Sequence, residues 1–256
     1  MIEPLHISSR DNPLLVVLRK LARDPAGYRK AGLVWLEGDH LCSALLARGQ
    51  RPAQALVSES GWQRPALRQL AAAAPRVLVL ADALLAGIST LESPAPIGFV
   101  LDAPAPPAIA PGLASVVLDR VQDAGNVGSI LRSAAAFGVG QVLALSGTAA
   151  LWSPKVLRAG MGAHFGLNLV EGLQIADLAA LQLPLVGTCL DTDALLPEVD
   201  LPQPCAWVLG HEGQGVSPAL LARCALQLRI PQPGGEESLN VAAAAAVCFY
   251  ESSRRR

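Results

Sequence analysis

Residues 114–145 read ASVVLDRVQDAGNVGSILRSAAAFGVGQVLAL, and this stretch decides the fold of the second part of the chain. Its two ends, ASVVLD and QVLAL, are apolar runs as long as buried strands, and a helix is expected between them near 128–137. Apolar strands that alternate with helices are typical of a parallel sheet covered on both faces. The sequence therefore predicts an α/β domain with a parallel sheet over residues 113–256. Further strands are expected in PLVGTCL, AWVLG and LQLRI, and helical stretches near 154–162, 176–182, 217–223 and 239–250.

The first part of the chain predicts a separate, smaller α/β module over residues 1–104. Apolar residues recur at helical spacing in NPLLVVLRKL, and GLVWLEG is a strand candidate, as are residues 55–57 and 77–80. Five prolines follow between Pro96 and Pro111. Proline at this density removes backbone donors and resists regular structure, so a linker is expected at 103–112.

Composition fits a globular protein, because 52% of the residues are hydrophobic and 16% are charged. The formal net charge is −1, so any contact with a polyanion has to come from local clusters of basic residues. The five cysteines are scattered without a CxxC pair, which predicts neither a disulfide framework nor a metal site. No signal-peptide core or membrane-length apolar run is visible, and the cytoplasm is the expected compartment.

Three loops that follow expected strands carry polar residues that the fold itself does not need: QDAGNVG, LGHEGQG and IPQPGGEESLN. Ligands bind at the loops that leave the carboxyl ends of parallel strands, so a site is expected where these loops meet. Taken singly, each loop has an ordinary explanation. Asn126 or the SLN stretch could cap a helix, Arg132 could be a surface cation, and Glu212 could lie in an exposed turn. His211 has no partner at metal-ligand spacing, so a structural or exposed role is expected.

A dinucleotide-dependent oxidoreductase is disfavoured by the same residues. GNVGSI is not the G-x-G-x-x-G pattern of a pyrophosphate loop, and no acidic strand end follows at about 20 residues.

Taken together, the three loops resemble the ordered motifs of the SpoU (TrmH-type) RNA 2′-O-methyltransferases of the SPOUT superfamily. The matching stretches are QDAGNVGSILRSAAAFGV, WVLGHEGQGVS and IPQPGGEESLNVAAAAAV. SPKVLRAGMGAHF also resembles the family, with one departure at Gly160, where serine is more common. The N-terminal module is similar to the substrate-binding domain attached to many of these enzymes, so the resemblance covers nearly the whole chain.

The resemblance implies a C-terminal parallel-sheet SPOUT domain with a deep trefoil knot, preceded by a smaller α/β RNA-binding domain that resembles ribosomal-protein-like folds. It also implies S-adenosylmethionine as methyl donor and a homodimer formed through the C-terminal domain. The expected cofactor-binding residues are Gly187, Thr188, Leu209, Gly210, Ile230, Ser238 and Leu239. The expected catalytic residues are Asn126, Arg132, Glu212, Ser238 and Asn240. The expected RNA contacts are Arg10, Arg19 and Arg29.

The implied reaction is attack of a ribose 2′-hydroxyl on the sulfonium methyl. Arg132 is expected beside the hydroxyl as an electrostatic stabiliser and not as a base, because a guanidinium stays protonated in proteins. Asn126 is expected to orient Arg132 or the ribose, and Glu212 to orient Arg132 or Asn126. Ribosomal RNA is favoured over tRNA, because family members with this N-terminal domain tend to modify rRNA. The alternatives are the same reaction on tRNA and a non-catalytic RNA-binding homologue.

Overall fold

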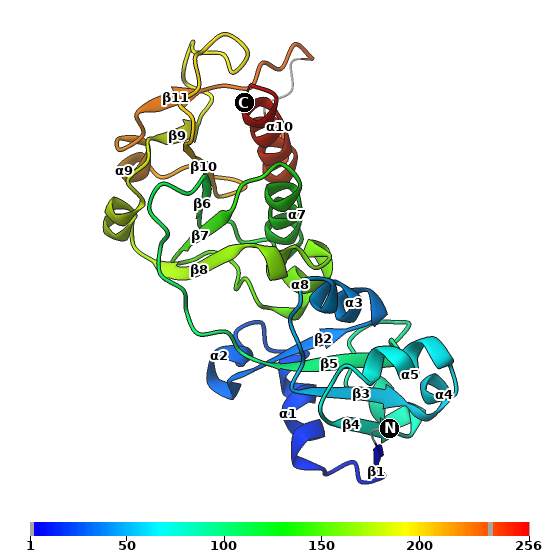
Figure 1. The fold of residues 1–256 in the computed structure, drawn as a ribbon. Coiled ribbons are helices and arrows are strands. Elements are labelled where there is room, and N and C mark those ends of the chain that lie inside the picture. The colour runs from blue at the N-terminus through cyan, green and yellow to red at the C-terminus, as the bar shows by residue number, and fades with distance from the viewer. Residues whose placement is uncertain (1–2, 235–237, 256) are drawn as a thin grey trace. The chain divides into compact units, whose positions relative to one another are not determined.

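The computed structural model describes residues 3–234 and 238–255, and the chain forms two compact units (Figure 1). The first unit comprises Met1–Ala105 and Trp152–Phe165, and the second comprises Pro106–Leu151 and Gly166–Arg256. The segment Trp152–Phe165 therefore packs with the first unit, although the chain on both sides of it belongs to the second.

The described part of the first unit has a five-stranded sheet in the order β1-β4-β3-β5-β2. Strands β1, β4 and β3 run parallel, whereas β5 is antiparallel to both of its neighbours. The strands are β1 (Leu5–Ile7), β2 (Leu33–Glu37), β3 (Gln54–Ser58), β4 (Val77–Leu80) and β5 (Ile97–Asp102). The helices are α1 (Pro13–Leu21), α2 (Gly27–Ala31), α3 (Asp39–Ala47), α4 (Glu59–Trp62), α5 (Pro65–Ala71), α6 (Asp82–Ala86) and α8 (Pro154–Gly160), and α8 is followed by the 3-10 turn η1 (Ala163–Gly166).

Helix α1 shows why the basic residues of this unit lie on its outer surface. The Asn12 side chain accepts a hydrogen bond from the Leu14 amide at 3.0 Å, and Pro13 occupies the first turn, where its missing N–H has no partner to lose. Leu15, Leu18 and Leu21 are buried on one face of the helix, whereas Leu14 and Val17, which the sequence also suggested for this face, are half-buried. Arg19 and Lys20 stand in the last turn, where positive charge is favourable to the helix dipole.

Across its described residues, the second unit has a six-stranded sheet in the order β11-β9-β10-β6-β7-β8, and every pairing is parallel. The predicted parallel sheet is confirmed. The strands are β6 (Ser115–Asp119), β7 (Gln141–Leu145), β8 (Asn168–Leu173), β9 (Leu185–Thr188), β10 (Ala206–Gly210) and β11 (Leu226–Leu228). The helices are α7 (Ala124–Ala136), α9 (Pro218–Leu221) and α10 (Val241–Arg254), with the 3-10 helix η2 (Ile175–Leu181).

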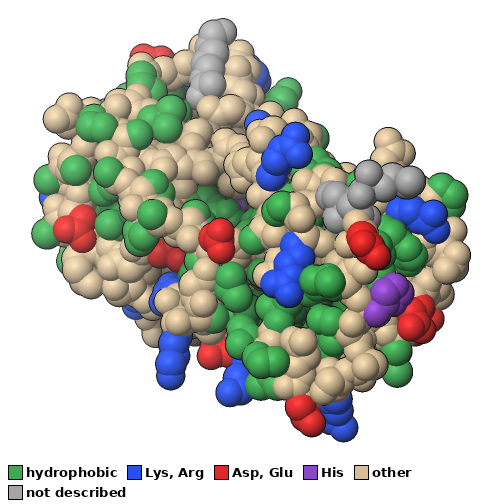
Figure 2. Space-filling model, turned by 60° about the horizontal axis from the view of Figure 1, so that its bottom comes forward, with side chains coloured by type: hydrophobic (Ala, Val, Ile, Leu, Met, Phe, Trp, Pro, Cys, Tyr) green, Lys and Arg blue, Asp and Glu red, His purple; other side chains and the backbone are tan. Residues whose placement is uncertain are grey.

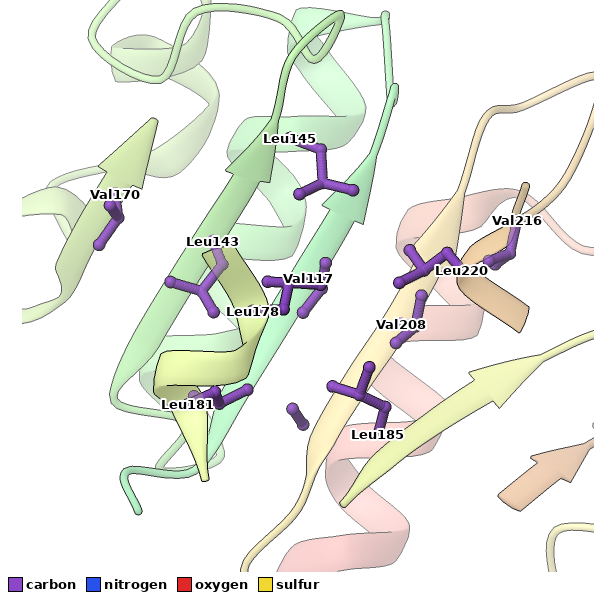
Figure 3. Close-up of a cluster of buried hydrophobic side chains, with 11 residues drawn as sticks. Val117, Leu143, Leu145, Val170, Leu178, Leu181, Leu185, Val208, Val216 and Leu220 are labelled. Atoms are coloured by element: carbon purple, nitrogen blue, oxygen red, sulfur yellow. The ribbon is translucent and has the colours of Figure 1, made fainter. Parts of the chain in front are cut away.

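One cluster of buried side chains in the second unit lies on one face of this sheet (Figure 3). Val117, Leu143 and Val208 come from neighbouring strands in register, and all three are fully buried. Leu178 and Leu181 of η2 cover them. Each such side chain contributes roughly 1.5–3 kcal/mol through burial, so the strand ends are carried on a rigid layer.

Helices α7 and α10 pack against each other. The C-terminal ends of the two helices meet at Phe137 and Tyr250, whose rings make an edge contact with centroids 6.0 Å apart. This pairing brings the beginning of α10 to the loop that precedes α7. The trefoil knot implied by the family resemblance stays a prediction.

Helices long and apolar enough to span a bilayer are absent from the part of the chain that the structure describes.

Candidate active site

The site begins at two neighbouring strand ends. β6 ends at Asp119 and β10 ends at Gly210, and these two residues are paired in register. The loop after β6 leads through Asn126 into α7, and the loop after β10 carries Glu212. Because parallel strands deliver their carboxyl ends to the same edge, the two loops meet there.

The Glu212 carboxylate holds the beginning of α7. Its Oε2 accepts a hydrogen bond from the Gln122 amide at 3.1 Å, and its Oε1 accepts one from the Asp123 amide at 3.0 Å. The same Oε1 accepts a third bond from Nδ2 of Asn126 at 3.1 Å. Burial raises the pKa of Glu212, but these hydrogen bonds outweigh it and bring the pKa below its ordinary value. Glu212 is therefore a fixed carboxylate at neutral pH.

Asn126 and Asn240 extend this contact to the third loop. Nδ2 of Asn240 donates to Oδ1 of Asn126 at 2.9 Å, and Oδ1 of Asn240 accepts bonds from the first amides of α10, those of Ala242 at 2.9 Å and Ala243 at 3.3 Å. A carboxylate can only accept and a backbone N–H can only donate, so the two ends of this chain of bonds fix the orientation of both amides. The three motif loops are thus joined through Glu212, Asn126 and Asn240.

The loop that carries Glu212 is a tight turn. The amide of His211 donates to the Gly215 carbonyl at 3.0 Å, and the Gly215 amide returns a bond to His211 at 2.8 Å. A Cβ on Gly210 would lie 2.0 Å from the carbonyl carbon of Gly215, so no other residue fits at this position. Gly210 was expected among the cofactor-binding residues, and the structure gives a reason for glycine at this position, the crossing of the chain's own backbone.

Arg132 stands apart from this network. It lies on α7 six residues beyond Asn126, which places it roughly a third of a turn away around the helix axis. Its side chain is exposed and has no hydrogen bond or ion pair with any described residue. Glu212 therefore orients Asn126 and not Arg132 within this chain, and a catalytic role for Arg132 stays a prediction.

The comparisons with known proteins place this arrangement in a family. Residues 114–250 match the family model described as SpoU rRNA Methylase. The chain is also 34% identical to an uncharacterized tRNA/rRNA methyltransferase of Synechocystis, over 98% of this chain and 94% of that protein. The chain belongs to the SpoU rRNA methylase family. The resemblance inferred from the three motifs is confirmed.

Two kinds of SpoU relative are informative beyond the family name. The 23S rRNA (guanosine(2553)-2′-O)-methyltransferase of Bacillus subtilis is 34% identical over 67% of this chain and 70% of its own length. The SpoU methyltransferase AviRb of Streptomyces viridochromogenes, solved in complex with AdoMet, superposes with a TM-score of 0.87 at 26% identity over 96% of this chain and 98% of that one. A solved RNA 2′-O ribose methyltransferase superposes with a TM-score of 0.81 at 31% identity over 98% of this chain and 99% of that one.

The cofactor-binding residues expected for a SpoU protein lie along three neighbouring strand ends. Gly187 and Thr188 close β9, Leu209 and Gly210 close β10, and Ile230 follows β11. The sheet order β11-β9-β10 brings these ends to one edge. Leu239, with Ser238 beside it, precedes α10 and is 41% exposed, which is unusual for a leucine of this unit. Residues 235–237 of the third motif lie outside the described residues.

Three buried polar atoms test whether this edge fits S-adenosylmethionine. Ser217 Oγ follows β10, and Arg229 Nε and Gln232 Oε1 follow β11; none of them has a hydrogen-bond partner among the described residues. A buried polar atom without a partner costs about 1–3 kcal/mol, so a polar ligand that supplied partners would be stabilised here. Apolar Ile230 and Leu239 suit a purine, and the polar atoms suit the rest of such a molecule. The residues present fit the cofactor.

Sequence reasoning missed the residues that hold the two loops in place. Asp119, Arg120 and Gln214 form a connected group that attaches the turn carrying Glu212 to the end of β6. The sequence contained one indication of this group, the acidic Asp119 at the end of the apolar run VVLD.

The arginines expected to contact RNA lie in two places on the first unit. Arg10, Arg19, Lys20 and Arg23 line an open cavity of about 890 Å³ at α1, together with Asp11, Val16 and Asp24. Nη2 of Arg19 donates to the Arg10 carbonyl at 2.6 Å and so holds the preceding loop against the helix. Arg29 is not among the lining residues; its guanidinium lies over the ring of Tyr28, 5.4 Å from the centroid.

Proposed function

We propose that this chain transfers the methyl group of S-adenosylmethionine to a ribose 2′-hydroxyl of RNA, and that the RNA is ribosomal. The observation that carries the proposal is the hydrogen-bonded chain from Glu212 through Asn126 to Asn240, which unites three separate loops at the edge of the sheet where the expected cofactor-binding residues lie. The rRNA 2′-O-methyltransferases among its relatives support the choice of rRNA.

The bound cofactor would supply an electrophilic methyl on a positively charged sulfur. The task of this chain's residues is then to hold the 2′-oxygen in line with that methyl and to stabilise the charge that the oxygen gains as it loses its proton. Asn126 and Asn240 are exposed enough to reach a ribose and are fixed in orientation. Arg132 carries the positive charge that an alkoxide needs, and it is free to turn toward a substrate.

None of the residues in the described network is a strong base. The pKa of Glu212 is lowered and its two oxygens already accept three hydrogen bonds, whereas the asparagines are neutral. We therefore assign Glu212 to positioning and infer that the hydroxyl proton would pass to solvent as the methyl group leaves the sulfur and bonds to the oxygen. Ser238, exposed beside Leu239, would complete the polar wall.

A homodimer through the C-terminal unit is part of the proposal. Along α10, Ala243, Val247 and Tyr250 follow one another at helical spacing and are all exposed, with Val247 41% and Tyr250 55% accessible. An apolar stripe on a surface helix favours contact with another protein surface. A second copy of the chain would cover it beside the exposed face of α7 that carries Arg132.

The last part of the proposal is that the first unit contacts RNA. Acidic and basic side chains alternate over the described surface drawn in Figure 2, so attraction has to come from local groups. The cavity residues Arg10, Arg19, Lys20 and Arg23 have no carboxylate partner among the described residues, which leaves their charges available to phosphates. Arg29, stacked on Tyr28, would add a flatter contact. The cytoplasmic location stays a prediction.

The test uses the whole protein with labelled S-adenosylmethionine and, in parallel, unmodified rRNA and unmodified tRNA. The proposal expects label in rRNA at a linkage that resists alkaline cleavage, because a 2′-O-methyl group blocks that cleavage. Label in tRNA alone would move the substrate to the alternative class. Label on a base, or in neither RNA, would overturn the proposed reaction.

A further inference from the structure

Arg120 has a backbone conformation that is costly for any residue with a Cβ atom. It is the first residue after β6 and has φ +59°, in the left-handed region that favours glycine. Its amide donates to Oγ1 of Thr148 at 3.1 Å, and this hydroxyl donates in turn to the Leu118 carbonyl at 2.9 Å. The surrounding structure therefore holds a sharp change of direction at the point where the chain leaves the sheet and turns toward Glu212.

The Arg120 side chain connects the end of β6 to the turn that carries Glu212. Its Nε donates to Oδ1 of Asp119 at 3.0 Å, and its Nη1 donates to Oε1 of Gln214 at 3.0 Å. Asp119 is only 3% exposed, and its Oδ2 accepts a bond from the Ser217 amide at 2.6 Å. The turn 211–217 is thus attached to the end of β6 at two points, directly at Ser217 and through the guanidinium at Gln214.

This attachment fixes the position of Glu212, which lies between Gly210 and Gln214 on the same turn. The amides of Gln122 and Asp123, which come directly after the Arg120 bend, are two of the three donors to Glu212. Arg120 therefore acts on both partners of that contact: its backbone directs residues 121–123, and its guanidinium holds the turn. The planar guanidinium presents its donors in a fixed fork and so holds two acceptors in a set geometry, which the flexible ammonium of lysine does less well.

We propose that Arg120 is a positioning residue that sets the register between the α7 loop and the Glu212 turn, and through it the orientation of Asn126. The inference rests on the proposed methyl transfer for its kinetic test, but the contact itself can be measured without activity.

The main test compares Arg120→Gly, Arg120→Lys and Gln214→Ala with the unaltered protein. Glycine tolerates the left-handed backbone, so Arg120→Gly removes the bridge without adding strain. We expect kcat to fall about tenfold in Arg120→Gly at an unchanged KM for S-adenosylmethionine, and the melting temperature to fall as well, because the buried Asp119 loses its charged partner. The kcat of Gln214→Ala should also fall, and Arg120→Lys should recover part of the kcat that Arg120→Gly loses.

A matched control is Arg223→Ala, because Arg223 is an exposed arginine of the same unit whose side chain donates to the Ile175 carbonyl and not to the two loops. Its kcat should equal that of the parent. A parent-like kcat in Arg120→Gly would overturn the inference. So would a parallel loss of kcat and melting temperature that lysine does not repair, because that result describes a general structural role.

Hydrogen exchange separates this inference from the proposed function. In the protein without substrate, the amides of Gln122 and Asp123 should exchange about tenfold faster in Arg120→Gly than in the parent or in Arg223→Ala. Unchanged exchange would overturn the positioning role. If the parent protein methylated no RNA, the proposed function would fail while this measurement would still decide the role of Arg120.

Discussion

Replacing Asn126 with aspartate puts an acceptor in place of one hydrogen-bond donor of the site while preserving the shape of the side chain. In the parent protein, Nδ2 of Asn126 donates to the Glu212 carboxylate at 3.1 Å. In Asn126→Asp an ionised oxygen faces that carboxylate instead. Losing a hydrogen bond to a charged group costs about 1.5–3 kcal/mol, and two like charges about 4 Å apart near water add ~1 kcal/mol. The second unit should lose about 3 kcal/mol of stability at neutral pH, or roughly 5–10 °C in melting temperature.

The pH dependence of Asn126→Asp gives the sharper measurement. The carboxylate groups that face the new aspartate are Glu212 and Asp123, whose side chain caps the Asn126 amide at 2.8 Å. Their negative charge raises the folded-state pKa of the new group above its unfolded value of about 3.9. A group with a raised folded pKa binds more protons when folded. The loss of stability is therefore complete above that pKa and shrinks as pH falls toward 4. Denaturant unfolding at pH 7.5, 6 and 5 measures this recovery.

Asn240→Asp is the matched control for this experiment. The Asn240 oxygen already accepts bonds from the first amides of α10, where a negative charge is favourable, and its amide nitrogen faces a neutral amide oxygen. We expect a loss of about 1 kcal/mol or less that depends little on pH. Equal, pH-independent losses in both variants would refute the assignment of donors and acceptors in the network.

Four other outcomes are expected. Arg132→Ala should lose about 100-fold or more in turnover with unchanged affinity for S-adenosylmethionine by calorimetry; normal turnover would remove it from the mechanism. Gly210→Ala should abolish cofactor binding or soluble expression, because its Cβ would meet the Gly215 backbone at 2.0 Å, whereas Gly213→Ala, with its nearest neighbour at 3.8 Å, should behave like the parent. Val247→Glu should yield monomers in light scattering; a dimer would move the interface elsewhere. Arg19→Glu should weaken RNA binding and flatten its salt dependence, and an unchanged slope would exclude the α1 cavity.

The parallel sheet of the second unit could be predicted because its central strands are buried on both faces. ASVVLD, QVLAL and AWVLG are continuous apolar runs, and they became β6, β7 and β10. β8 (Asn168–Leu173) was not predicted, since Glu171 and Gly172 interrupt the run NLVEGL at the sheet edge, where one side of the strand meets water. The helix expected at 176–182 is the 3-10 helix η2.

The sequence named Asn126, Glu212 and Asn240 as candidates, and the structure joins these three, but the sequence did not show the contacts between them. Asn126 was a candidate helix cap, and that interpretation is wrong: Asp123 caps α7, which releases the Asn126 side chain for Glu212 and Asn240. Asn240 does cap α10 and joins the network as well, because an asparagine can accept at its oxygen and donate at its nitrogen. The register of β6 against β10 and the packing of α10 on α7 bring these loops together, and single-sequence patterns do not contain contacts between elements so far apart.

Arg120 and the segment Trp152–Phe165 were missed for related reasons. Nothing in the pattern LDRVQD marks a left-handed residue, since such a conformation at arginine depends on partners 28 and 94 residues away. Likewise, Trp152–Phe165 packs with the first unit through contacts such as that of Gln50 with the Phe165 carbonyl at 3.2 Å, 115 residues apart. Long-range contacts of this kind override local preference.

The hydrogen-bond inventory of the network indicates which chemistry it can assist. Asn126 and Asn240 each use one of two amide hydrogens within the network, so each keeps one N–H donor for a ligand. Arg132 adds a guanidinium that can only donate, whereas the acceptors of Glu212 are largely occupied. A site rich in free donors and poor in free acceptors is suited to an oxygen that gains negative charge, and unsuited to removing a proton from carbon. Transfer to a hydroxyl oxygen, whose charge grows as its proton departs, is the reaction that such an inventory stabilises most.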